Sequence, residues 1–280
     1  MDKKLTIAEI RERKGSGQRV VVLTAYDAAM ARVLDSEGVD IVLVGDSLGM
    51  VLLGYDSTVP VTMDEMLHHC RAASRGVQRA LLVADMPFLS YQVEPAEAVR
   101  NAGRFLKEAG CDAVKIEGGV AMADTVRALI RAGIPVMGHI GLTPQTASQL
   151  GGFRVQGKDL AAARSVLADA RAIAAAGAFA IVLECLPAEL AARVTRDVAV
   201  PTIGIGAGSA CDGQVLVTHD LLGLFEKFTP RFVKRYAELA PQVRTAIQGF
   251  RDEVAAGRFP GPEHSFAMAA EVLARLDEEG

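Results

Sequence analysis

The sequence predicts a (β/α)8 TIM barrel, an α/β fold, with extra helices at both ends of a single catalytic domain covering residues 1–280. Three observations predict it. A chain of 280 residues suits one barrel of this kind. Short apolar runs rich in Val and Ile recur along the chain, and helical patterns lie between most of them. Alternating strands and helices indicate a parallel sheet, and eight strands favour a closed barrel over a doubly wound sheet.

The eight apolar runs are the predicted strands. Each is continuous rather than alternating, as expected when both faces of a parallel sheet are buried. The runs cover residues 20–24, 41–45, 80–84, 113–116, 135–138, 180–183, 201–205 and 215–218.

The helices are predicted from periodicity and from their end signals. A glycine follows four of them directly, at Gly38, Gly110, Gly133 and Gly177, which is a strong stop signal. Thr62 and Glu65 have the spacing of a capping box. Residues 1–14 are charged and helix-like; the other predicted helices cover 28–38, 62–76, 94–109, 119–132, 158–176 and 187–197, with 231–256 and 265–278 beyond the core.

Composition excludes several classes of protein. The net charge is −4 with both signs mixed along the chain, so no nucleic-acid partner is expected. The longest apolar stretches run about six residues, too short for a membrane span. The amino terminus lacks the apolar run of a signal peptide. The four cysteines are scattered without a CxxC pair, which favours reduced thiols and a cytoplasmic location.

Charged side chains collect where the predicted strands end, which is the end of a (β/α)8 barrel that carries the active site. They are Asp46 and Ser47 after the second run, Asp85 after the third, Lys115 and Glu117 at the fourth, His139 after the fifth and Glu184 after the sixth. Taken singly, each has a structural explanation as a helix cap, an internal ion pair or a packed histidine. Together, four carboxylates at one barrel mouth would repel each other unless cations or protons occupy the site.

These residue types predict a magnesium site that acts on a small 2-oxo acid. Asp46 and Asp85 offer the hard oxygen ligands that Mg²⁺ prefers, with Glu117 as a third ligand, directly or through water. A metal that chelates a 2-oxo acid acidifies the adjacent C–H and stabilises the enolate. Glu184 follows an apolar strand, so desolvation would raise its pKa toward that of a general base. We expect Lys115, together with Ser47 and His139, to bind the carboxylate or the developing oxyanion of the substrate.

Three further segments remain open. Residues 139–157 are too long and Gly-rich for an ordinary turn, which favours a lid or binding loop over a floppy insertion. Gly204, Gly206 and Gly208 form either a phosphate cradle or a structural bend, and His219 with Asp220 is equally ambiguous. His68 and His69 diverge around their helix and are expected at the surface or behind the site.

Six ordered blocks resemble the ketopantoate hydroxymethyltransferase family over about residues 5–265. They are TAYD at 24–27, GDSLGM at 45–50, DMPF at 85–88, KIEG at 115–118, GHIGLTPQ at 138–145 and IGIGAG at 203–208. The resemblance implies transfer of a hydroxymethyl group from 5,10-methylenetetrahydrofolate to 3-methyl-2-oxobutanoate, forming ketopantoate in pantothenate biosynthesis. It also implies a homo-oligomer, a decamer in bacterial members, joined in part by carboxyl-terminal helices.

Carried over residue by residue, the resemblance assigns Mg²⁺ to Asp46 and Asp85, with Glu117 holding the metal's shell. Ser47 and Lys115 would bind the 2-oxo acid, His139 would line the pocket and Glu184 would accept the proton. Three alternatives remain: a metal-dependent C–C lyase of the isocitrate lyase and phosphoenolpyruvate mutase type, a Schiff-base aldolase using Lys115, and a non-catalytic metabolite-binding barrel. The lyases often carry a Lys-Lys-Cys-Gly-His stretch that is missing here.

Overall fold

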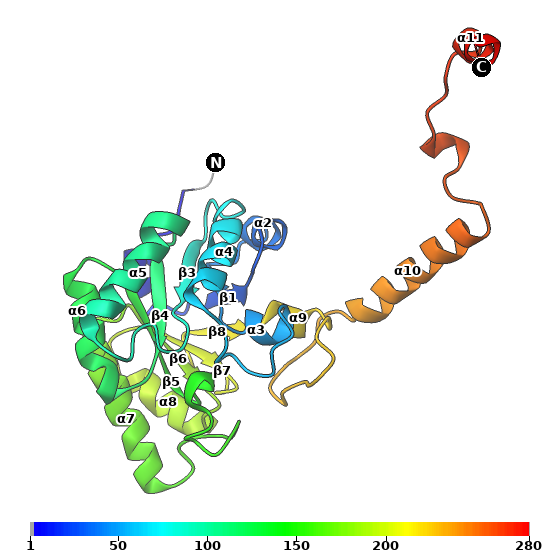
Figure 1. Cartoon of the computed structure of the whole chain (residues 1–280). Coiled ribbons are helices and arrows are strands. Elements are labelled where there is room, and N and C mark those ends of the chain that lie inside the picture. Colours follow the sequence, from blue (N-terminus) through cyan, green and yellow to red (C-terminus); the bar gives the residue numbers. More distant parts are fainter. Residues whose placement is uncertain (1–2, 280) are drawn as a thin grey trace.

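The computed structural model describes residues 3–279 and forms a closed barrel of eight parallel strands in the order β1 to β8 (Figure 1). The barrel closes where Val20 of the first strand pairs with Gly213 of the last. The strands are β1 Val20–Thr24, β2 Ile41–Val44, β3 Leu81–Asp85, β4 Ala113–Glu117, β5 Val136–Gly141, β6 Ala180–Glu184, β7 Thr202–Ile205 and β8 Gly213–Leu216. All eight predicted strands are confirmed. The fifth is longer than predicted, so His139 lies inside it rather than after it.

The helices around the barrel are confirmed with small shifts at their ends. They are α1 Ile7–Glu12, α2 Ala28–Ser36, α4 Met63–Ser74, α5 Pro95–Ala109, α6 Ala123–Arg131, α7 Leu160–Ala175 and α8 Ala188–Asp197, with short turns at α3 Leu48–Val51, α9 Thr218–Leu221, η1 Val120–Met122 and η2 Pro144–Thr146. The four predicted stop glycines all have positive φ, 70° at Gly110 for example. The capping box is present, with Glu65 Oε2 accepting from the Thr62 backbone N–H at 2.7 Å.

Alternation along the strands divides the barrel interior into an apolar lower part and a polar upper part. On β4, Ala113 points inward and belongs to the interior core cluster, while Val114 and Ile116 pack outward under the helices. The same inward row continues to Lys115 and Glu117 near the end of the strand, because side chains alternate with a period of two. At the opposite end of the barrel, Ile10 of α1 is fully buried in the interior cluster. On β4, the inward row thus carries its charged side chains toward the carboxyl end of the strand.

The carboxyl-terminal helices leave the barrel. Figure 1 shows α10 (Leu239–Ala255) and α11 (Ala270–Glu279) extending away from it, joined by a segment that includes η3 (Pro262–His264). The prediction of a helix from residue 231 was wrong at its start, because residues 225–238 turn back along the barrel and the Tyr236 N–H donates to the Leu221 carbonyl at 2.9 Å. The second predicted helix also begins later, at Ala270. Among residues 3–279, no helix is both long and apolar enough to cross a membrane.

Candidate active site

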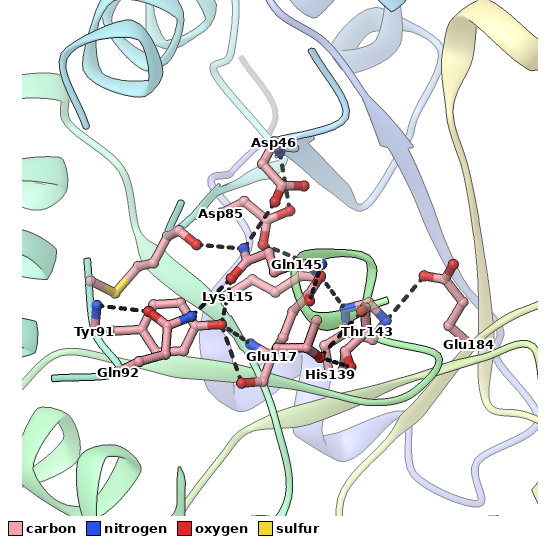
Figure 2. Close-up of polar contacts among 12 residues, drawn as sticks. Asp46, Asp85, Tyr91, Gln92, Lys115, Glu117, His139, Thr143, Gln145 and Glu184 are labelled. Atoms are coloured by element: carbon pink, nitrogen blue, oxygen red, sulfur yellow. Dashed lines mark hydrogen bonds and ion pairs between the residues drawn. The ribbon is translucent and has the colours of Figure 1, made fainter. Parts of the chain in front are cut away.

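The predicted site residues meet at the carboxyl end of the barrel, and Figure 2 shows their contacts. Strand β3 supplies Asp85, β4 supplies Lys115 and Glu117, β5 supplies His139 and β6 supplies Glu184. Asp46 and Ser47 follow β2 after one intervening residue, Gly45. Asp46, Asp85, Lys115, Glu117 and His139 are all buried, at 2 to 5% exposure. Such burial of charged groups is rare unless they pair with each other or with ions.

The first group of contacts joins Asp46, Asp85 and Lys115. Lys115 Nζ lies 2.6 Å from Asp85 Oδ1, and Asp85 Oδ2 accepts from the Asp46 backbone N–H at 3.3 Å. Burial raises the pKa of the Asp46 carboxyl well above its usual range, and the charges of Asp85 and Glu117 add to the effect. Burial also raises the pKa of Asp85, although Lys115 opposes the shift. This corner of the site thus holds more negative charge than Lys115 alone neutralises.

The second group joins Glu117, His139 and Glu184. His139 lies between the two carboxylates, with Nδ1 3.3 Å from Glu117 Oε1 and Nε2 3.1 Å from Glu184 Oε2. Both are ion-pair distances, but neither contact has hydrogen-bond alignment within the described chain. Burial and Lys115 lower the pKa of His139, yet the two glutamates outweigh them and raise it to about 9. Burial of Glu117 would raise the pKa of that carboxyl, but His139 and Lys115 reverse the shift and lower it.

Ser47 lies at the edge of the site beside a residue that was not predicted to take part. Its Oγ is 3.0 Å from the hydroxyl of Tyr26, which follows β1. Tyr26 is buried, and its carbonyl accepts a hydrogen bond from His69 Nδ1 at 2.8 Å, so His69 lies behind the site as expected. Ser47 also stands before the short helix α3, which the apolar pattern did not reveal because it is only four residues long.

Gln145 is the main residue that the strand-end argument missed. It lies in η2, after the strand has ended, and is 3% exposed. Its side-chain Nε2 donates to Asp46 Oδ2 at 2.9 Å, and its backbone N–H donates to Glu117 Oε2 at 3.0 Å. Its position in the GHIGLTPQ block was visible in the sequence, but the contact with Asp46 spans 99 residues. No local pattern reports a contact of that kind.

The long connection after β5 is attached to the end of β6 at both of its ends. The Leu142 N–H donates to the Glu184 carbonyl, and the Gln156 N–H donates to the Cys185 carbonyl, both at 2.9 Å. Cys185 itself has a positive φ of 49°, which is unusual for a residue with a side chain. The segment 142–156 is thus fixed to the strand that supplies Glu184.

The remaining open segments border this group of contacts, since Ile205 before the Gly-rich turn pairs with Glu184 and His219 lies beside Tyr26. The described chain passes from β7 to β8 through the Gly-rich turn without a helix. A Cβ on Gly206 would lie 2.7 Å from the ring of Phe232, so the turn packs closely against a side chain, as a structural bend does. His219 lies in α9, with its ring centroid 5.5 Å from that of Tyr26.

Known proteins resemble this chain over nearly its whole length. The family model described as Ketopantoate hydroxymethyltransferase matches residues 4–262. A 3-methyl-2-oxobutanoate hydroxymethyltransferase from Heliobacterium modesticaldum is 59% identical over 272 residues, covering 97% of this chain and 99% of the relative. The protein of the same name from Syntrophus aciditrophicus is 58% identical, covering 94% of this chain and 97% of its own.

Solved structures share the fold at low sequence identity. A phosphoenolpyruvate phosphomutase from Streptomyces platensis subsp. rosaceus aligns with a TM-score of 0.61 at 18% identity, covering 98% of this chain and 97% of that chain. A phosphonopyruvate hydrolase solved with oxalate and Mg²⁺ aligns with a TM-score of 0.60 at 12% identity, covering 98% and 96%. At these identities the likeness supports the barrel fold alone.

The closed barrel and the buried charged layer at its carboxyl end define an enzyme of the (β/α)8 class. The family match and the relatives at 58 and 59% identity narrow this class to transferases. The chain belongs to the ketopantoate hydroxymethyltransferase family.

Proposed function

We propose that this enzyme transfers a hydroxymethyl group from 5,10-methylenetetrahydrofolate to 3-methyl-2-oxobutanoate and forms ketopantoate. One observation carries the proposal. The chain is a member of this family, and the buried layer at its barrel mouth combines the carboxylates of Asp46 and Asp85 with Lys115 and Glu184. These are the groups that enolate chemistry on a 2-oxo acid requires: metal ligands, a cation and a base. The named relatives support the same substrate and reaction.

The carboxylates fit a divalent cation. Asp46 and Asp85 are adjacent and buried, and burial, with the charge of neighbouring carboxylates, raises the pKa of both groups although Lys115 opposes the shift. Among residues 3–279, no three Asp, Glu, His or Cys side chains converge as a metal cage. Mg²⁺ bound by one or two carboxylates, with water and substrate in its other positions, needs no such cage. Bound there, it would acidify the C3–H of the chelated 2-oxo acid.

The contacts of Glu117 favour a position beside the water ligands of the proposed metal over direct coordination. Its Oε2 accepts from the Gln145 N–H and its Oε1 faces His139, so both oxygens already have partners. We therefore assign Glu117 to the water shell of the metal rather than to direct coordination. Lys115 and Ser47 would bind the carboxylate and keto oxygens of the 2-oxo acid, and His139 would line the pocket between them and β6.

Glu184 is the proposed general base. Its side chain is 14% exposed, the most open of the charged groups whose contacts join the layer, so a substrate can reach it. His139 Nε2 lies at an ion-pair distance of 3.1 Å from one carboxylate oxygen, and the other oxygen would accept the proton from C3. The carbanion formed at C3 then bonds to the methylene carbon of the folate. Both bonds from that carbon to the folate nitrogens break, a water molecule supplies the hydroxyl oxygen, and the nitrogens take up the protons from C3 and from water, so that ketopantoate and tetrahydrofolate are the products.

The test is proton–deuterium exchange at C3 of 3-methyl-2-oxobutanoate in D₂O, followed by NMR, with Mg²⁺ and then with EDTA. Exchange that requires the metal supports the proposal and excludes a binding protein. Glu184→Gln should lose about 10²- to 10⁴-fold in exchange rate while still binding the substrate. Near-normal exchange in that variant would remove Glu184 as the base. Exchange indifferent to EDTA would favour a Schiff base on Lys115, which borohydride would trap.

We further propose that the enzyme works as a homo-oligomer, a decamer as the family resemblance implies, in the cytoplasm. Within the described chain, no residue of α10 is buried, and Ile247 and Phe250 are 61% and 57% exposed. The outer face of the barrel at β8 and β1 is also open, with Val21 47% exposed. A second copy of the chain would cover both surfaces. Free thiols at Cys70, Cys111, Cys185 and Cys211 agree with a reducing compartment.

A further inference from the structure

Gln145 uses every hydrogen-bonding atom of its side chain inside the site, as Figure 2 shows. Its Nε2 donates to Asp46 Oδ2 and to the Met86 carbonyl, both at 2.9 Å. Its Oε1 accepts from the Tyr91 hydroxyl at 2.8 Å and from Gln92 Nε2 at 3.1 Å. An amide offers two donors and one acceptor oxygen with two lone pairs, so the set is complete.

The surrounding groups fix which way this amide points. The Met86 carbonyl can only accept, so the nitrogen of Gln145 must face it. On the other side, the Gln92 Oε1 accepts from the Tyr91 backbone N–H, which turns the Gln92 nitrogen toward Gln145 Oε1. Reversing the amide would place acceptor against acceptor and donor against donor. Asp46 Oδ2 therefore always receives an N–H.

The side-chain amide and the backbone N–H of Gln145 donate to carboxylates from different parts of the barrel. Lys115 pairs with Asp85 Oδ1, and the partner of the Asp46 side chain is the neutral amide of Gln145. The backbone N–H of the same residue holds Glu117 Oε2. One buried residue thus sets the separation and orientation of Asp46 and Glu117, which repel each other.

We infer that Gln145 is a positioning residue that holds Asp46 and Glu117 in the arrangement that binds a divalent cation. The inference rests on the proposed function, since it assumes that these carboxylates serve a metal. Gln145 acts through the carboxylates rather than on the reacting atoms. Outer-shell hydrogen bonds of this kind typically change metal affinity by about 10- to 100-fold when they are removed.

The test is Gln145→Met, which keeps an unbranched side chain of similar length and removes the amide. Mn²⁺ binding to the folate-free protein is measured by electron paramagnetic resonance, because Mn²⁺ suits the same oxygen ligands. We expect about 10- to 100-fold weaker binding. The matched control is Gln149→Met, a glutamine in the same segment that is exposed, and its affinity should equal that of the wild type. An unchanged affinity in Gln145→Met overturns the inference.

A second readout separates positioning from a general loss of structure. Saturating Mg²⁺ should restore much of the C3 exchange rate of Gln145→Met, because the defect lies in metal affinity. A rate that stays low at saturation with normal Mn²⁺ affinity also overturns the inference. If Gln145→Met does not fold, Tyr91→Phe decides. It removes the hydrogen bond that the hydroxyl donates to Gln145 Oε1 and the one that it accepts from the Glu117 backbone N–H at 3.0 Å. Both help to position the two carboxylates, so about threefold or greater weakening of Mn²⁺ binding is expected. Wild-type affinity in Tyr91→Phe rejects the inference.

The wild-type protein distinguishes this inference from the proposed function. If it binds no Mn²⁺, the metal assignment fails and the role of Gln145 fails with it. If it binds Mn²⁺ and exchanges C3 in a metal-dependent way while Gln145→Met binds equally well, only the role of Gln145 is rejected.

Discussion

Burial and ion pairing have opposite effects on the pKa of single residues at the barrel mouth. Lys115 and Glu117 are two residues apart on β4, so both point inward, and each meets a partner from a neighbouring strand. An internal ion pair was the structural alternative considered for Lys115, and its Nζ does lie 2.6 Å from Asp85 Oδ1. A buried lysine without such a partner would lose its proton. Here its pKa is raised, because Asp85 and Glu117 outweigh the effect of burial.

Asp220 in α9 provides a test of electrostatics away from the proposed metal. Burial raises the pKa of this half-buried carboxyl from 3.8 to about 6, although Arg235 opposes the shift. A folded-state pKa above the unfolded value means that the folded state binds the proton more tightly. Between pH 3.8 and about 6, raising the pH therefore weakens the folded state as this carboxyl ionises.

We expect Asp220→Asn to remove that penalty. Its free energy of unfolding, measured by urea titration, should rise relative to the wild type as the pH increases from 4 to 7. The two proteins should differ least near pH 4, where the wild-type carboxyl is mostly protonated when folded. A difference between variant and wild type that is independent of pH would show that Asp220 does not titrate in this range.

At the scale of elements, the strands and most helix ends could be predicted because their signals are local. Continuous apolar runs marked all eight strands, and glycines with positive φ ended the helices. The end of β5 was set too early, because His139 and Gly141 interrupt the apolar pattern while still pairing with β6. Gln145 could not be assigned, since its role depends on where residues 46 and 117 lie in space. The strand-end residues were predictable because the barrel itself brings them together.

Gly141 shows how closely β5 and β6 approach at the site. It has a φ of 94°, and a Cβ there would lie 2.3 Å from the Glu184 carbonyl oxygen. Gly151, in the same connection, also has a positive φ of 75°, but a Cβ there would meet only the far end of Arg154, at 3.8 Å. The two glycines share the backbone requirement and differ in their surroundings.

We therefore expect Gly141→Ala to cost more than Gly151→Ala. The left-handed backbone alone costs about 1–2 kcal/mol per alanine. Gly141→Ala must also displace the Glu184 backbone, so its free energy of unfolding should fall further and its C3 exchange rate should drop with it. Urea unfolding and the exchange assay measure both. Equal losses in the two variants would mean that the close approach to Glu184 has no consequence.

At the scale of the whole molecule, the chain separates into a barrel and an arm that does not pack on it (Figure 1). Helix α10 has 17 residues, and helices of this length owe most of their stability to packing of an apolar face. Val243, Ile247, Phe250 and Val254 follow a helical spacing and are all 47 to 61% exposed. Such a face requires a partner surface. In the proposed homo-oligomer, the open outer side of β8 and β1 on another copy of the chain would provide one.

The arm can be tested in the intact chain by placing charges on opposite sides of α10. Ile247→Glu combined with Phe250→Glu puts two carboxylates on the apolar face, and these would be buried in an interface without a partner. Thr245→Glu combined with Gln248→Glu changes the net charge equally on the other face. We expect sedimentation velocity to give the wild type and the second variant the same large mass, and the first variant a much smaller one. An assembly that survives charges on the apolar face would place the subunit contacts elsewhere, and α10 would then need a different partner to cover it.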